Sequence, residues 1–244
     1  MTDDTAVLVL QLAAPLQSWG SSSRFTRRTT NAEPTKSGLV GMLASAQGRR
    51  RSDPIEDLVS LRFGVRVDRP GVLEPDFQTA IRREPMRGGG FRPVSMPLSH
   101  RFYLSDAVFV AAVEGPRSVL DGLADAVRRP RHPLALGRRS CPPAGGIPVE
   151  VVSTTLEEAM RTVPWRGAYR SAPRGWQPPE RLHVVRDLAL GESREAAERE
   201  HDVPLSFDPE HRKFGWRWVR REWVPNPSLE AVGAFRHDAF GEVD

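Results

Sequence analysis

The order of apolar segments in the first 152 residues is the feature that most limits how this chain can fold. Residues 5–12 read as a buried strand, and residues 34–48 place Leu39 and Leu43 on one face of a helix. A short helix is predicted at residues 54–61 and strands at residues 62–68 and 103–113. A further helix at residues 116–127 and a last strand at residues 147–152 complete the series. A strand–helix–strand–strand–helix–strand order is that of an α+β fold of ferredoxin-like (RRM-type) topology, with helices covering one face of an antiparallel sheet. The other face of the sheet, or its loops, could hold RNA.

We expect this first domain to span residues 1–153. The pattern weakens afterwards, and residues 154–244 are predicted to form a β-rich elaboration packed on the first domain. Within it, residues 192–200 indicate an acidic helix that is either exposed or in contact with a partner. The aromatic residues Phe214, Trp216 and Trp218 alternate as in a strand. Tryptophans at this spacing are more often core than a surface for stacking bases, so we favour the core.

An insertion at residues 76–104 separates the second and third strands. Its ends can pair as a long hairpin, and its middle contains Gly88, Gly89 and Gly90. We interpret it as a projecting basic thumb whose arginines hold phosphates and whose apolar tip wedges between bases, with a floppy surface loop as the alternative.

The single cysteine, Cys141, excludes an intrachain disulfide, and no paired Cys/His spacing suggests a metal site or another cofactor. A reducing, cytoplasmic compartment fits this composition. The apolar run at residues 6–16 is short and is interrupted by Gln11, so we expect neither a signal peptide nor a membrane span.

Positive charge gathers in three parts of the sequence. Residues 19–52 contain seven cations and one acid, residues 77–105 contain five arginines and one acid, and residues 128–141 contain five arginines and no acid. Such segments could converge on one face and bind nucleic acid, although an unconnected, solvated scatter would give the same counts.

The start of the predicted helix at residues 34–48 resembles the end of a phosphate-binding loop. The sequence Thr35-Lys36-Ser37 lacks the glycines that such a loop needs, because Thr30 and Thr35 stand in their places. The first turn could still stay open to an anion such as a phosphate, or Thr35 or Ser37 could simply cap the helix.

Several stretches together resemble the CasD family of CRISPR-associated proteins. They are QLAAPLQSWG with SRFTRRTT (Gln11 to Thr30), PTKSGLVGML (Pro34 to Leu43), FGVRVDRPG (Phe63 to Gly71), DFQTA (Asp76 to Ala80), HRFYLSDAVF (His100 to Phe109) and LGRRSCPP (Leu136 to Pro143). CasD is the subunit of the type I-E interference complex, Cascade, that holds the 5′ handle of the CRISPR RNA (crRNA). The resemblance fades after about Val152.

The resemblance implies a RAMP domain with a β-hairpin thumb that caps a filament of Cascade backbone subunits and contacts the large subunit. It implies crRNA as the ligand and target DNA near the handle as a further partner. Carried over by position, the loop at residues 138–141 would bind the 5′ end of the handle, and the residues after Ser18 would line its path. The RNA-binding residues expected from the sequence and the resemblance are Trp19, Arg24, Arg27, Arg28, Lys36, Ser37, Arg83, Met86, Arg87, Arg101, Arg138, Arg139, Ser140 and Cys141.

Related type I-C proteins cut precursor RNA with a tyrosine, a lysine and a histidine. Here the matching pair is Ser99 and His100, Ser99 supplies no cation, and the only tyrosines are Tyr103 and Tyr169. We therefore predict a non-catalytic RNA-binding subunit, with a metal-independent endoribonuclease that uses His100 as the alternative. An assembly protein that acts without RNA is a third hypothesis.

Overall fold

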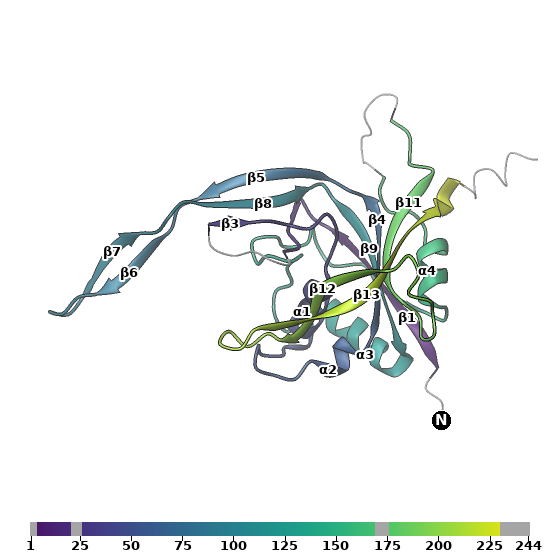
Figure 1. Cartoon of the computed structure of the whole chain (residues 1–244), viewed down its shortest axis with the longest axis horizontal. Helices are drawn as coiled ribbons and strands as arrows, with labels where there is room; N and C mark the ends of the chain where they lie inside the picture. Colours follow the sequence, from purple (N-terminus) through teal and green to yellow (C-terminus); the bar gives the residue numbers. More distant parts are fainter. Residues whose placement is uncertain (1–3, 21–25, 169–175, 230–244) are drawn as a thin grey trace, which may run out of the picture.

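The computed structural model of the protein describes residues 4–20, 26–168 and 176–229. Its centre is a seven-stranded sheet with every neighbouring pair antiparallel, in the order β10-β1-β9-β4-β11-β13-β12 (Figure 1). The strands of this sheet are β1 Thr5–Ala13, β4 Arg62–Arg69, β9 Val108–Pro116, β10 Val149–Val152, β11 Arg181–Asp187, β12 Glu198–Ser206 and β13 Lys213–Pro225. The helices are α1 Lys36–Gln47, α2 Glu56–Val59, α3 Arg117–Arg128 and α4 Leu156–Thr162.

The elements β1, α1, β4, β9, α3 and β10 occur in the predicted order, close to the predicted bounds. Thr35 caps α1 by accepting a hydrogen bond from the Gly38 N–H at 3.2 Å, and Gly48 ends the helix with φ 82°. Leu120 and Leu123 face inward from α3 and share one core with the buried residues of α1 and β1. Both helices therefore cover the same face of the sheet.

The opposite face of the sheet is covered at β1 and β9, so the prediction that this face could hold RNA is wrong for that part of the sheet. Val7 and Val9 of β1 pack there against Leu156 and Met160 of α4 in a second buried cluster. A sheet face buried by apolar contacts has no room for bases.

The insertion forms a long two-part hairpin that projects from the body of the protein (Figure 1). Its inner half pairs β5 Val72–Gln78 with β8 Ser99–Ser105, and its outer half pairs β6 Ile81–Pro85 with β7 Phe91–Ser95. The predicted single strand at residues 103–113 is wrong, because the chain turns at Asp106, which has φ 54°. That turn separates β8, in the hairpin, from β9, in the central sheet.

The region after residue 153 continues the central sheet through β11, β13 and β12. The helix predicted at residues 192–200 is wrong, since residues 188–197 form turns and β12 begins at Glu198. Glu192 fixes these turns by accepting hydrogen bonds from Arg186 and Arg220 at 2.7–3.0 Å. Local composition favoured a helix, but these contacts with neighbouring strands decide the conformation.

The two tryptophans expected in the core are not there. The side chain of Trp216 is 57% exposed, and Trp218 is partly exposed. Alternation along β13 was correctly predicted, but the face on which these rings lie is on the surface. Across the described ranges, no helix has the length and apolar character needed to cross a bilayer.

Candidate nucleic-acid interface

Three segments that are distant in sequence meet beside β8, at the base of the projecting hairpin. β2, Leu16–Gln17, pairs with the end of β8, and β3, Arg27–Arg28, lies parallel to its start, opposite His100 and Arg101. The loop at residues 136–141 joins them through a bridge between Ser18 and Gly137. The topology thus brings together one part of each of the three basic segments.

The approach of the loop to Ser18 requires glycine at position 137. Gly137 has φ 86°, and a Cβ atom there would lie 1.9 Å from the Ser18 carbonyl oxygen. The Ser18 N–H donates to the Leu136 carbonyl at 3.1 Å, and the Cys141 N–H donates to the Arg138 carbonyl at 2.9 Å. The loop is therefore folded tightly against the strand that precedes β3.

The side chain of Arg138 links the loop at residues 136–141 to β3 and β8. Its guanidinium donates to the carbonyls of Phe102 at 3.0 Å, Arg28 at 2.6 Å and Thr29 at 3.1 Å. It also lies over the ring of Tyr103, 5.1 Å from the centroid. Since its donors are directed at protein carbonyls, Arg138 positions β3 against β8, and the prediction that it binds the 5′ end of an RNA is not supported.

Other cations of this site remain free to contact a ligand. Arg27, Arg28 and Arg139 are exposed, and Arg27 stacks over Phe102 at 5.0 Å. Arg101 is partly buried, and its Nε atom is shielded from water without a hydrogen-bond partner. None of the four forms an ion pair with a residue in the described ranges. A buried donor without a partner is costly, so an acceptor supplied by a ligand would stabilise this surface.

The structure corrects the prediction for two residues that it buries. Trp19 packs its indole on Gly38 of α1, and its Nε1 donates to Gln17 Oε1 at 3.1 Å. Cys141 is buried behind the exposed Ser140, and burial raises the pKa of its thiol. Trp19 and Cys141 therefore shape the site from inside and do not line its surface.

The start of α1 is closed, so the prediction that its first turn stays open to an anion is wrong. The Lys36 N–H donates to Asp202 Oδ2 at 2.7 Å, and the Lys36 ammonium lies 3.0 Å from Asp187 Oδ2. Arg217 bridges the two carboxylates at 2.6 Å from each. Ser37 is buried beside this network. The chain's own carboxylates thus occupy the place expected for phosphate, and neither Lys36 nor Ser37 reaches the surface as an RNA contact.

The charges of this network hold one another in place. Burial alone would raise the pKa of Asp187, but Arg217 and Lys36 outweigh it and hold that pKa below its ordinary value. The Phe63 N–H also donates to Asp187 at 2.9 Å. The network therefore links β11, β12 and β13 to α1 and β4.

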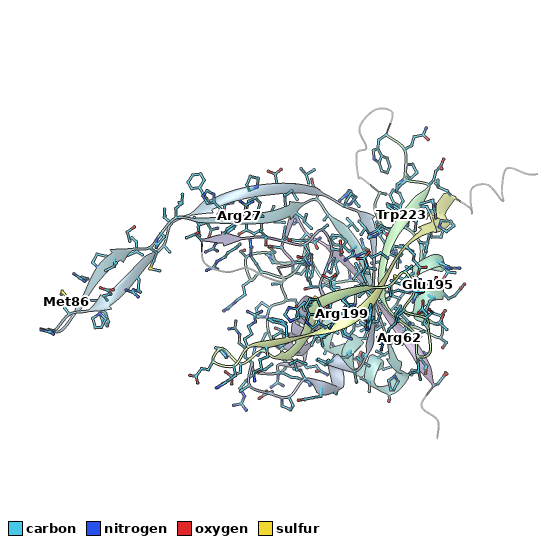
Figure 2. All side chains as sticks on the ribbon, viewed as in Figure 1. Arg27, Arg62, Met86, Glu195, Arg199 and Trp223 are labelled. Atoms are coloured by element: carbon cyan, nitrogen blue, oxygen red, sulfur yellow. The ribbon has the colours of Figure 1, made fainter. Side chains whose placement is uncertain are left out.

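The projecting hairpin carries the remaining predicted contacts. Arg83 lies on β6, and Met86 and Arg87 lie at the turn that ends the hairpin (Figure 2). All three are exposed, and neither arginine has an ion-pair partner in the described part of the chain, whereas Glu84 pairs with two neighbouring arginines. Arg24 and Tyr169 lie outside the described residues.

Within the described ranges, which do not include Tyr169, the three groups expected of an RNA-cutting site are not assembled around His100. His100 is exposed on β8, and its N–H donates to the Thr26 carbonyl at 2.7 Å. Its neighbour Ser99 donates to the Gln78 carbonyl, and Tyr103 is buried beneath Arg138. Among the described residues, no three His, Cys, Asp or Glu side chains gather as a metal site would require.

Comparison with known proteins identifies the family. A family model described as CRISPR-associated protein (Cas_Cas5) matches residues 7–220. The chain belongs to the Cas5 family of CRISPR-associated proteins. It is 35% identical over 151 residues to the Cascade subunit CasD of Escherichia coli K12, a match that covers 55% of this chain and 66% of that protein.

Two solved structures resemble the Cas5 chain over nearly its whole length. One, described as the crystal structure of a Cas protein, is 36% identical, with 90% of this chain and 95% of the other covered and a TM-score of 0.67. The other, from a CRISPR RNA-guided surveillance complex, is 34% identical, with 90% and 91% covered and a TM-score of 0.68. The α+β architecture is thus shared with Cas proteins.

Sequence reasoning missed the partners that organise this Cas5 site. Asp187, Asp202 and Arg217 all lie outside residues 192–200, the segment predicted to be an acidic helix. The available signal was the acid excess of residues 187–202, with six acids against two arginines, which could have suggested pairing with the basic segments of the first 141 residues. The identity of the paired residues depends on the order of strands in the sheet.

Proposed function

We propose that this Cas5-family chain is a non-catalytic, RNA-binding subunit of a type I-E CRISPR surveillance complex, Cascade, in antiviral defence. It would hold the 5′ handle of crRNA. The observation that carries the proposal is the convergence of β3, β8 and the loop at residues 136–141 into one surface with unpaired arginines. Unpaired cations on a preorganised surface bind phosphates, and the relative CasD is named as a Cascade subunit.

The domain organisation follows from the same proposal. The strand order β10-β1-β9-β4, with α1 and α3 on one face, supports a ferredoxin-like RAMP domain at residues 1–153. The hairpin within residues 76–104 would act as its thumb, and residues 154–244 would be an elaboration that extends the sheet.

The RNA would cross the base of the hairpin and continue toward its tip. Arg27 and Arg28 present two neighbouring cations along this path, and Arg101 offers the unpartnered Nε. Arg139 and Ser140 would meet the 5′ end of the handle. Farther out, Arg83 and Arg87 would hold phosphates while the apolar Met86 contacts bases.

The protein would cap a filament of Cascade backbone subunits and contact the large subunit, with target DNA passing near the handle. The exposed apolar residues of the hairpin support a subunit that is covered by partners. They include Phe77, Ile81 and Phe91, which are 64–72% exposed.

The alternative function is metal-independent cleavage of precursor RNA. His100 lies opposite Arg27, so a base and a cation are neighbours on adjacent strands. The buried position of Tyr103 and the absence of a cation at Ser99 favour binding without cutting.

A single experiment separates the two functions. The purified protein is incubated in EDTA with labelled CRISPR repeat RNA and run on a native gel for binding and a denaturing gel for cutting. We expect a shifted, intact band that depends on the 5′ handle. A specific cut that His100→Ala abolishes would make the protein the processing nuclease and contradict the proposal.

Two variants test where the handle lies. Arg27→Ala should weaken binding to all RNAs alike, and Arg139→Ala should weaken the handle more than an RNA of unrelated sequence. Equal and small effects of both would place the RNA on another face. Complex formation that is unaffected by RNase treatment from the start would instead favour the RNA-independent assembly protein.

A further inference from the structure

The hairpin formed by β12 and β13 carries aromatic rings and arginines on one surface, which we name the ladder. Trp216 and Trp218 lie on β13 at alternate positions, so both side chains point to the same face. The ladder comprises the rings of Phe214, Trp216 and Trp218 and the guanidinium groups of Arg194, Arg199 and Arg212.

Each ring of the ladder is stacked with a guanidinium group. Arg199 lies 4.8 Å from the ring centroid of Trp216 and 5.9 Å from that of Trp218, which is directly across the sheet in the β12–β13 register. Arg194 lies 5.3 Å from Trp218, and Arg212 lies 5.1 Å from Phe214. Stacking fixes the plane of each guanidinium while its N–H groups stay available at the edge.

The arginines of the ladder have no acidic partners. None of Arg194, Arg199 and Arg212 forms an ion pair with any residue that the structure describes. The other face of β13 is the opposite case, because Arg217 and Arg221 there pair with five carboxylates between them. Two further acids, Glu192 and Glu222, pair with Arg186 and Arg220, so among the described residues the arginines of the ladder are left without a carboxylate partner.

The rings are also open to water. Trp216 is 57% exposed although Arg199 and His201 lie against it, with the His201 ring centroid at 4.6 Å. An exposed tryptophan on a rigid strand offers a flat surface for another ring. Successive rings along the strand are separated by about 6.6 Å, two strand residues, which provides a series of stacking positions.

We propose that the ladder binds single-stranded nucleic acid at a site separate from the handle. The stacked arginines would hold phosphates, and Trp216 and Trp218 would stack with bases, without sequence preference. An acidic protein segment would satisfy the arginines but would leave the aromatic faces in water, so the combination of both features favours nucleic acid. The proposal does not depend on the function proposed for β3 and β8.

The position of the ladder suits a strand that continues past the subunit. Figure 1 shows the β12–β13 hairpin extending from the sheet toward the same side as the long β5–β8 hairpin, and Figure 2 places Arg199 on it. β12 is the last strand at its end of the central sheet, so the hairpin that carries the ladder has a free edge within the described residues.

The test uses the full chain and labelled oligothymidine and oligouridine of about 12 nucleotides, a length within the site size of one such surface. All variants are made in a chain that also carries Arg27→Ala and Arg28→Ala, so that the handle surface contributes little. We expect Trp216→Ala and Arg199→Ala each to raise the Kd about tenfold in fluorescence anisotropy. Trp216→Phe keeps an aromatic face and should give a smaller loss.

Two control variants match these changes away from the ladder. Trp223→Ala removes a tryptophan that is also 57% exposed on β13 but lies on the opposite face, with its ring tilted against that of His183 at 5.2 Å between centroids. Arg161→Ala removes an exposed arginine from α4. Both should stay within about twofold of the parent.

The outcomes are distinct. Equal affinities of the Trp216→Ala and Trp223→Ala variants for both oligonucleotides would overturn the proposal. Binding of polyglutamate without binding of the oligonucleotides would also overturn the proposal, since that result assigns the ladder to an acidic protein partner. Tighter binding of oligouridine would indicate an RNA strand and tighter binding of oligothymidine a DNA strand, and either supports the ladder. Loss of handle binding bears on the proposed function alone.

Discussion

The backbone N–H of Lys36, at the first position of α1, donates to the carboxylate of Asp202, 166 residues further along the chain. A helix start has free N–H groups and a positive dipole end, and an aspartate is the anion that satisfies both here. The last strands of the sheet are thereby bound to the helix that supports Trp19 and the proposed RNA surface. The two halves of the chain consequently depend on each other for stability.

Asp202→Ala should destabilise the protein strongly. The substitution leaves the N–H of Lys36 without its acceptor and removes the main partner of the partly buried Arg217. Removing one member of a buried ion pair typically costs about 3–5 kcal/mol. Urea denaturation followed by tryptophan fluorescence measures the loss in the free energy of unfolding.

Glu210→Ala is the matched control for this change, because it removes an exposed acid near the β12–β13 turn. We expect its unfolding midpoint to equal that of the parent. If both variants unfolded at the same urea concentration as the parent, the contact of Asp202 with α1 would contribute nothing to the free energy of unfolding.

The sequence was sufficient to predict elements whose own periodicity decides their structure. The spacing of apolar residues predicts α1 and α3. The glycine-rich middle of the long hairpin marks its turn, so the pairing of its two ends is predicted as well. The sequence was insufficient where distant contacts decide. The turns before β12 depend on Glu192 and Arg186, and the closed start of α1 depends on Asp202, whose proximity no local pattern reveals. The exposure of Trp216 likewise depends on which face of β13 packs toward α1, and the local sequence does not reveal that.

Stability should fall in acid as Glu192 becomes protonated. Hydrogen bonds from Arg186 chiefly, and also from the Ala189 N–H and Arg220, lower the pKa of Glu192 to about 2. A carboxyl group whose pKa is depressed in the folded state contributes stability above its unfolded pKa of about 4.3, and this is lost as the pH falls through the folded value. Urea midpoints measured from about pH 5 to pH 2 should therefore decline.

Glu192→Gln should flatten this decline, because the variant has no proton to take up at that position. Glu195→Gln, an exposed acid in the same turns, should decline as the parent does. If the urea midpoints of the parent, Glu192→Gln and Glu195→Gln proteins fell equally with pH, Glu192 would not be the group responsible for the decline.

Gly137→Ala should disrupt the loop at residues 136–141. An added Cβ would lie 1.9 Å from the Ser18 carbonyl oxygen, and φ 86° is strained for alanine. Backbone strain of this kind costs about 1–3 kcal/mol, and the handle affinity should fall as well. Gly145→Ala is the control, since Gly145 has φ 131° but no atom within 4 Å of an added Cβ. An equal effect of both would show that strain alone, and not the contact with Ser18, explains the loss.

The salt dependence of RNA binding should report the contacts of β3. If Arg27 and Arg28 each meet one phosphate, the double alanine variant should reduce the log-log slope of affinity against salt by about 1.4. Filter binding at several salt concentrations provides the slope. Arg50→Ala with Arg51→Ala removes the same charge beyond the end of α1 and should leave the slope near that of the parent. A slope reduced equally by both pairs would mean that net charge, and not contact, controls binding.

Cys141 should report on the integrity of the loop through its rate of alkylation. It is the only cysteine, it is buried, and burial raises the pKa of its thiol, so both access and the thiolate fraction are low in the folded protein. We expect slow labelling by iodoacetamide near pH 8, and fast labelling in denaturant. Gly137→Ala should accelerate the reaction under native conditions because it displaces the loop whose hydrogen bonds hold Cys141, whereas Gly145→Ala should not. Handle RNA should slow the reaction further if it binds at Arg139 and Ser140, the two exposed residues that precede Cys141 in the loop, and rapid labelling that RNA leaves unchanged would separate this loop from the RNA site.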